Sequence, residues 1–212
     1  PHARRQLQLT LGVAQALSYL HSRRPCVMHG DLKPANILVE QRASGPFPKL
    51  LDFGLSRLVT QNAKKAGGTL KYMAPEIVPN GDVPRRPSAD MDVFSLGRLM
   101  FCVASGRKPL ALCTGKAVLR SLRRGEALDL EWEPGSRLLT TLRPIMERCM
   151  VIQPEDRPTA QEVHRWTHAQ KVRDSDSEHR QPSADQPAGA SPGSSAREDD
   201  DYSSPTCSPI SL

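Results

Sequence analysis

The sequence predicts an α+β domain that is mainly helical, over residues 1–168, followed by a disordered tail over residues 169–212. Three observations lead to this prediction. Several segments have the apolar periodicity of helices, whereas strand-like runs are few and short. The last forty residues are rich in serine, proline and acidic residues, and such a composition buries too little apolar surface to offset the entropy of ordering.

Each predicted helix has its own signature. Residues 5–22 place leucine and alanine at spacings of three and four, which gives one apolar stripe. Residues 90–105 are apolar nearly all round, so this helix belongs in the middle of the domain. Residues 144–150 begin with a proline, which does no harm in a first turn. Residues 159–170 open with a Thr-x-x-Glu capping box.

The predicted strands cover residues 37–39 and 49–51. A loop that contains Gly45 and Pro46 joins them, and both residue types favour turns. One small hairpin beside the helices is therefore expected.

Composition and charge exclude several classes of protein. The longest mostly apolar stretch, residues 93–104, is too short to span a bilayer and includes Arg98, so no membrane segment is predicted. The five cysteines are odd in number and lack C-x-x-C spacing, which favours buried reduced thiols over disulfides or a zinc cluster. The net charge is +6, but residues 173–212 hold eight acidic and three basic residues, so the rest carries +11. That charge suits an anionic ligand.

Three short motifs carry the chemical signal. HGDLKPAN occupies residues 29–36, DFG residues 52–54, and APE residues 74–76. Each is weak alone, but their order and spacing are specific, with 21 positions from Asp31 to Asp52 and 22 from Asp52 to Ala74. The sequence resembles the catalytic loop, metal-binding loop and activation segment of eukaryotic protein kinases. DVFSLG at residues 92–97 and Arg157-Pro158 match the same family in register.

The resemblance implies a protein-kinase-like fold and a phosphoryl-transfer site that uses ATP and Mg²⁺. Asp31 would accept or orient the proton of the substrate hydroxyl. Lys33 would place a positive charge at the γ-phosphate, and Asn36 and Asp52 would supply hard oxygen ligands to Mg²⁺. Leu38 would lie under the adenine ring.

The resemblance also favours serine or threonine of a protein substrate as the phosphate acceptor. Lys33 in the DLKPAN run is the version found in serine/threonine kinases, and the motifs are most similar to those of the tyrosine-kinase-like group. Thr69, in GTLKYMAPE at residues 68–76, matches their threonine whose hydroxyl bridges the catalytic aspartate and the lysine. A phosphorylation site at Thr69 is the alternative interpretation.

Other matched residues have structural roles in the family. Asp92 would accept hydrogen bonds from the catalytic-loop backbone, and Glu76 and Arg157 would form a buried ion pair. His29 and Phe53 would stack in a hydrophobic column.

Departures from the family limit these expectations. Neither a G-x-G-x-x-G run nor a V-A-I-K lysine precedes the catalytic loop, so the resemblance implies the C-terminal lobe only, from helix E to helix I. Because the lysine–glutamate pair needed for activity is missing, we expect the isolated chain to be inactive. Gly30 replaces the arginine that, in many family members, binds the phosphate of the activation segment.

Two functions fit the sequence. The first is the catalytic lobe of a protein serine/threonine kinase, and the alternative is a pseudokinase or truncated scaffold that binds protein partners without catalysis. Retention of Asp31, Lys33, Asn36 and Asp52 favours the first. Nucleic-acid binding is not expected, because basic pairs such as Arg85-Arg86 and Arg123-Arg124 form no stripe with aromatic residues. The expected location is the cytoplasm or the cytoplasmic side of a membrane, and the oligomeric state is not indicated.

Overall fold

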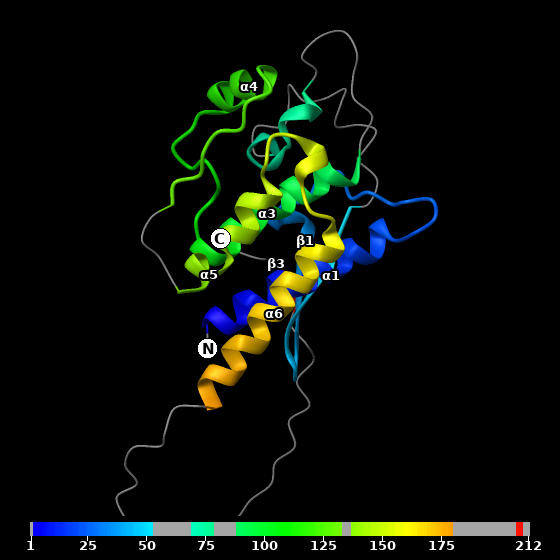
Figure 1. The fold of residues 1–212 in the computed structure, drawn as a ribbon, viewed down its shortest axis with the longest axis vertical. Coiled ribbons are helices and arrows are strands. Elements are labelled where there is room, and N and C mark those ends of the chain that lie inside the picture. Colours follow the sequence, from blue (N-terminus) through cyan, green and yellow to red (C-terminus); the bar gives the residue numbers. More distant parts are fainter. Residues whose placement is uncertain (1, 53–68, 79–87, 133–136, 180–206, 210–212) are drawn as a thin grey trace, which may run out of the picture.

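The computed structural model describes residues 2–52, 69–78, 88–132, 137–179 and 207–209. Helices dominate, as predicted, and a small sheet lies beside them (Figure 1). The predicted residues Phe53 and Gly54 of the DFG motif lie outside the described residues.

Helix α1 spans His2–His21 and buries the predicted apolar stripe. Its buried side chains, Leu7, Thr10, Leu11, Val13, Ala14 and Leu17, recur at helical spacing. This face packs against helix α6, Ala160–His179, and strand β2, Gly45–Leu50. The N-terminal helix is therefore the bridge between the sheet and the C-terminal helix (Figure 1).

The hairpin is longer than the sequence predicts. Strand β1, Ile37–Arg42, pairs antiparallel with β2, from Ile37 opposite Leu50 to Arg42 opposite Gly45. Gly45 and Pro46 belong to β2 and not to the loop, which corrects the prediction. Prolines are tolerated there because β2 is an edge strand in the order β2-β1-β3. Strand β3, Cys207–Pro209, pairs with the other edge of β1.

Helix α3, Ala89–Ser105, lies at the centre of the domain, as its apolar sequence predicts. All residues from Met91 to Ala104 are buried. It packs against α1 and against helix α5, Arg137–Cys149. Gly97 allows the close approach to α5, because a Cβ there would lie 2.9 Å from Cys149 Cβ and 2.8 Å from Met150 Cγ. The central helix therefore needs a glycine at this crossing.

Helix α5 corrects a predicted boundary. The sequence predicts a helix that begins at Pro144, but the helix begins at Arg137 and Pro144 lies inside it. A proline inside a helix removes one hydrogen bond and costs about 3 kcal/mol. The apolar stripe continues on both sides of it, and its buried members are Leu138, Leu139, Leu142, Ile145, Met146 and Cys149. Burial of this stripe offsets the cost of the proline.

Helix α6 extends past the predicted end at residue 170 and past the predicted domain boundary at 168. It begins at Ala160 and ends at His179, because the sequence holds neither glycine nor proline between Pro158 and Pro182 to stop it. Its N-terminus has the predicted capping box. Thr159 N–H donates to Glu162 Oε2 at 2.8 Å, and Glu162 N–H donates to Thr159 Oγ1 at 3.2 Å.

Helix α4, Gly115–Arg123, was not predicted. It is short, and only Val118, Ser121 and Leu122 are buried, so its apolar signal is weak. The side chain of Thr114 caps it by accepting the N–H of Ala117 at 3.2 Å. It packs against the 3₁₀ turns η3, Thr69–Tyr72, and η4, Pro75–Ile77.

The cysteine prediction holds in part. Cys102 and Cys149 are buried, and burial raises the pKa of the Cys149 thiol to about 12. Cys113 is half-buried, whereas Cys26 is exposed and so departs from the prediction. In the described part of the chain, no helix is both long and apolar enough to cross a membrane.

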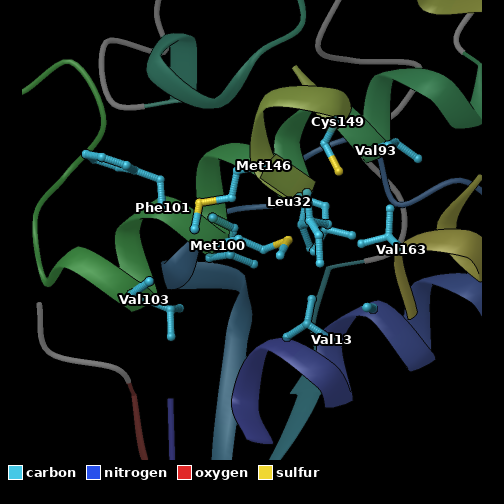
Figure 2. Packing of buried hydrophobic residues seen from close by; sticks show 14 of the residues in the cluster. Val13, Leu32, Val93, Met100, Phe101, Val103, Met146, Cys149 and Val163 are labelled. Atoms are coloured by element: carbon cyan, nitrogen blue, oxygen red, sulfur yellow. The ribbon is translucent and has the colours of Figure 1, made fainter. Parts of the chain in front are cut away.

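One apolar core joins these elements. Val13 of α1, Met100 of α3, Met146 of α5 and Val163 of α6 all belong to it (Figure 2). Leu32 lies in the middle of the same cluster and is almost fully buried, although it comes from a loop. The core therefore holds the residue next to Asp31 in place.

Replacing Thr159 with alanine tests the capping box. Loss of the cap is expected to lower the free energy of unfolding by about 1 kcal/mol, measured by urea denaturation. Thr141→Ala is the matched control, because that exposed hydroxyl bonds only to the Arg137 carbonyl within α5 and caps nothing. Equal losses in the two variants would contradict the assignment.

Candidate active site

Two of the three residues predicted to carry catalysis, Asp31 and Lys33, meet in one loop with Asn36. Lys33 Nζ donates to Asp31 Oδ2 at 2.6 Å. Asn36 Nδ2 donates to the same oxygen at 3.1 Å and to the Asp31 carbonyl at 2.8 Å. The Asp31 side chain is buried, and its Oδ1 has no hydrogen-bond partner within the described residues. One carboxylate oxygen is thus held by protein donors, while the other is left to accept a proton from a further group.

Asp92 of α3 holds the start of this loop, as predicted. Its carboxylate accepts the backbone N–H of His29 at 2.8 Å through Oδ2 and that of Gly30 at 2.8 Å through Oδ1. His21 Nε2, at the end of α1, donates to Oδ2 at 3.0 Å. Only 2% of Asp92 is exposed, so these donors compensate a buried charge. This loop is therefore tied to α3 and, through His21, to α1.

His29 is buried beneath the loop. Burial lowers its pKa, and the charges of Asp92 and Asp31 oppose this effect. Its Nδ1 accepts the backbone N–H of Asp31 at 3.3 Å, which requires an unprotonated Nδ1. The neutral imidazole thus orients the backbone of Asp31.

Asp52 lies beside Asn36 because the hairpin brings the two ends of the sheet together. Leu51 N–H donates to the Asn36 carbonyl at 2.9 Å, just after the Ile37–Leu50 pair. Asp52 is exposed and has a φ of 60°, in the left-handed region that few residues other than glycine adopt. Residues in such strained backbone conformations often cluster at active sites.

The donor set fits a hard divalent cation bound with nucleotide phosphates. The amide nitrogen of Asn36 is used by Asp31, which leaves the amide oxygen for a cation. Asp52 adds an exposed carboxylate. It follows Leu51, whose N–H bonds to the Asn36 carbonyl. Within the described ranges, no group of three His, Cys, Asp or Glu side chains could hold a metal alone. Mg²⁺ is usually bound by few protein ligands together with phosphate oxygens of the substrate.

The remaining predicted site residues are less closely placed. Leu38 is half-buried on β1, opposite Lys49 of β2 and Pro209 of β3. Thr69 begins η3, but its side chain lies outside the described part of the chain. The proposed contacts of Leu38 with adenine and of Thr69 with Asp31 and Lys33 therefore stay predictions.

Glu76 and Arg157 form the predicted ion pair. The pair is bidentate, with Arg157 Nη1 on Glu76 Oε1 and Nη2 on Oε2 at 2.9 Å. The Arg157 side chain is fully buried, and it also donates to the carbonyls of Val151, Ile152 and Asp90. The turn that contains the APE motif is thereby joined to α3 and to the start of α6.

Two buried polar contacts, made by His21 and by Arg98, were not predicted. His21 follows Leu17 by four positions, so it continues the buried stripe of α1, and a polar residue there is the signal that could have identified it. Arg98 is buried within α3 and donates to the carbonyls of Leu128 and Lys71. Burial lowers its pKa to about 10. Its apolar neighbours in the sequence gave no indication of these partners.

Comparisons with known proteins agree with the predicted family. The family model described as protein kinase domain matches residues 3–167, and the chain belongs to the eukaryotic protein kinase family. It is 35% identical over 161 residues to human receptor-interacting serine/threonine-protein kinase 3, a match that covers 71% of this chain and 30% of that protein. It is 32% identical over 160 residues to calcium-dependent protein kinase 9 of Oryza sativa subsp. japonica, covering 74% and 26%.

The name of a third relative states a different specificity. The dual specificity mitogen-activated protein kinase kinase hemipterous of Drosophila melanogaster is 34% identical over 161 residues, covering 74% of this chain and 13% of that protein. The chain thus spans less than half the length of each of these relatives. The family implies ATP, a divalent metal and protein substrates at a general level.

Removing Glu76 tests the buried ion pair. Glu76→Ala leaves the buried Arg157 charge without its carboxylate, and the expected loss is about 3–5 kcal/mol of unfolding free energy. Glu147→Ala is the matched control, because its pair with Arg143 within α5 is about half exposed. That change is expected to cost about 0.3–0.5 kcal/mol. Urea denaturation measures both, and similar losses would contradict the structural role of Glu76.

Gly30 tests the conformation of the catalytic loop. Its φ is 78°, so Gly30→Ala is expected to lower the unfolding free energy by about 1 kcal/mol through steric strain. Gly115→Ala is the control, because that position has no positive φ and a Cβ there meets no atom within 4 Å. The control is expected to be neutral or slightly stabilising. A neutral Gly30→Ala would contradict the left-handed conformation.

Proposed function

We propose that this chain is the catalytic lobe of an ATP-dependent protein serine/threonine kinase. The observation that carries the proposal is the arrangement of Asp31, Lys33 and Asn36, with one carboxylate oxygen of Asp31 held by two donors and the other without a partner in the described structure. Asp52 completes the set from the neighbouring end of the hairpin. These are the residue types that phosphoryl transfer requires, since its catalysis is mainly positioning and charge neutralisation.

The geometry suggests a separate task for each side chain. Asp31 Oδ1 would receive or orient the hydroxyl proton of the acceptor, while Lys33 and Asn36 keep the carboxylate in one orientation through Oδ2. Lys33 also brings a positive charge to the place where the transferred group develops negative charge. Asn36 and Asp52 would hold Mg²⁺, which neutralises the ATP phosphates when bound. Leu38 would contact the adenine, and Thr69 would bridge Asp31 and Lys33.

Serine and threonine are the proposed acceptors. The DLKPAN run with Lys33 and the GTLKYMAPE run with Thr69 support this choice. Of the three relatives above, one is named a serine/threonine-protein kinase and one a calcium-dependent protein kinase. The third is named a dual specificity kinase. The choice among serine, threonine and tyrosine acceptors therefore needs a direct measurement.

A scaffold without catalysis is the alternative, because Gly30 lacks the guanidinium through which many family members respond to phosphorylation. Asp92 binds the Gly30 backbone N–H and needs no side chain there, so the loop keeps its position with glycine. Retention of the complete Asp31, Lys33, Asn36 and Asp52 set supports the enzyme over the scaffold.

The test uses the protein as its own gene encodes it, with whatever sequence flanks these 212 residues. Labelled phosphate transfer from ATP is measured with peptides that differ only in a serine, threonine or tyrosine acceptor. Asp31→Asn is expected to lower kcat by about 10²–10⁴, the typical contribution of a general base. Asp156→Asn, at an exposed site in the turn before α6, is the control and is expected to have no effect. Absence of transfer by the unsubstituted protein would favour the scaffold, and preference for tyrosine would contradict the acceptor.

A further inference from the structure

Helix α4 presents a stripe of positive charge to solvent. Lys116, Arg120 and Arg123 are exposed, at spacings of four and three that place them on one side of the helix. Val118, Ser121 and Leu122 are buried on the opposite side. We call Lys116, Arg120 and Arg123 the α4 stripe. At 1.5 Å of rise per residue it is about 10 Å long.

The α4 stripe has no acidic partner within the described residues. None of its three cations forms an ion pair there, whereas Arg42, Arg107 and Arg143 each pair with a glutamate. Helix α4 itself contains no acidic residue. The helix C-terminus accounts for the cations of Arg120 and Arg123, which both lie in the last turn, but not for Lys116 in the first turn. Three unpaired cations in a row are therefore available to an external anion.

Helix α4, which carries the stripe on its exposed side, packs beside the segment that leads to the APE motif. Helix α4 packs on η3 and η4, at the end of the domain away from the N-terminus of α1 (Figure 1). Lys71 of η3 donates to the carbonyl of Leu110, at 2.6 Å, in the loop before α4. The helix is thus tied directly to the turn that Thr69 begins.

An exposed apolar side chain lies four positions before Lys116 in the sequence. Leu112, in the same loop before α4, is 80% exposed. Residues 108–128 contain no aromatic side chain on which a nucleic-acid base could stack. A basic row with one exposed leucine fits an acidic peptide that carries an apolar residue better than it fits a nucleic acid.

We propose that the α4 stripe is a docking site for an acidic segment of the protein substrate, outside the residues that receive phosphate. The proposal rests on the proposed kinase function for the identity of the partner. Three or four residues of extended chain span the stripe, so a short run of glutamate or aspartate is sufficient. Because its charges are exposed, docking is expected to weaken as salt is raised above about 0.1 M.

Peptide binding tests the proposal without phosphate transfer. The probe is a fluorescein-labelled peptide of about twelve residues that contains glutamates around one leucine, and its control has glutamine in place of each glutamate. Affinity for the full chain is measured by fluorescence anisotropy. The variant Lys116→Glu, Arg120→Glu, Arg123→Glu is expected to bind the acidic peptide at least tenfold more weakly. The variant Arg4→Glu, Arg5→Glu, Arg24→Glu changes net charge equally at exposed sites elsewhere, and is expected to lose less than threefold.

Several outcomes would overturn the proposal. They are failure of the unsubstituted chain to bind the peptide, equal loss in the two triple variants, and equal binding of the glutamine peptide. An oligoribonucleotide that binds the stripe more tightly than the peptide would assign it to nucleic acid instead. If the stripe variant shows a lower unfolding temperature, Arg120→Gln alone is used, with at least a threefold loss expected.

The chain's own acidic residues provide a competing occupant. A full-length variant with Glu198→Gln, Asp199→Asn, Asp200→Asn and Asp201→Asn is expected to bind the peptide as the unsubstituted chain does. Tighter binding by this variant would assign the stripe to that acidic run and overturn the external partner. If the peptide binds but the gene-encoded protein transfers no phosphate, the docking site is supported and the kinase proposal is contradicted.

Discussion

The position of the catalytic loop depends on one buried carboxylate. Asp92 accepts hydrogen bonds from the backbone of His29 and Gly30 and from the ring of His21. A buried charge without such donors would cost several kcal/mol, so loop and helix stabilise each other. Because two of the three donors are backbone groups of the loop, the interaction sets the direction of the chain just before Asp31.

Helix α3 collects the other constraints on the site. Leu32, the residue after Asp31, packs in the same core as Val93 and Met100 (Figure 2). At the N-terminal end of α3, the Asp90 carbonyl accepts a bond from Arg157, which in turn holds Glu76. The catalytic loop and the APE turn, far apart in the sequence, are thus positioned from one helix. Helix α3 can position both segments because it is almost completely buried, and close-packed interiors deform little.

The bond to Asp92 explains why a glycine is accommodated at position 30. The loop needs a left-handed residue there, with a φ of 78°, and a backbone N–H aimed at Asp92. Glycine satisfies both needs with less strain than any other residue. Glycine has no side chain that could bind a phosphate, so the position contributes only its backbone bond to Asp92.

The helical class, the family motifs and the capping box at Thr159 could be predicted from the sequence, because they depend on local periodicity or on motif spacing along the chain. The pairing of Glu76 with Arg157 was predicted only from the resemblance to protein kinases, since the two residues lie 81 positions apart. The folded structure was needed to place Pro144 inside α5, to extend α6 to His179 and to pair His21 with Asp92. Each of these outcomes depends on which surfaces are buried against distant elements. A local propensity of a few kcal/mol or less is overridden by such burial, and a single polar residue reveals its partner only when the chain has folded around it.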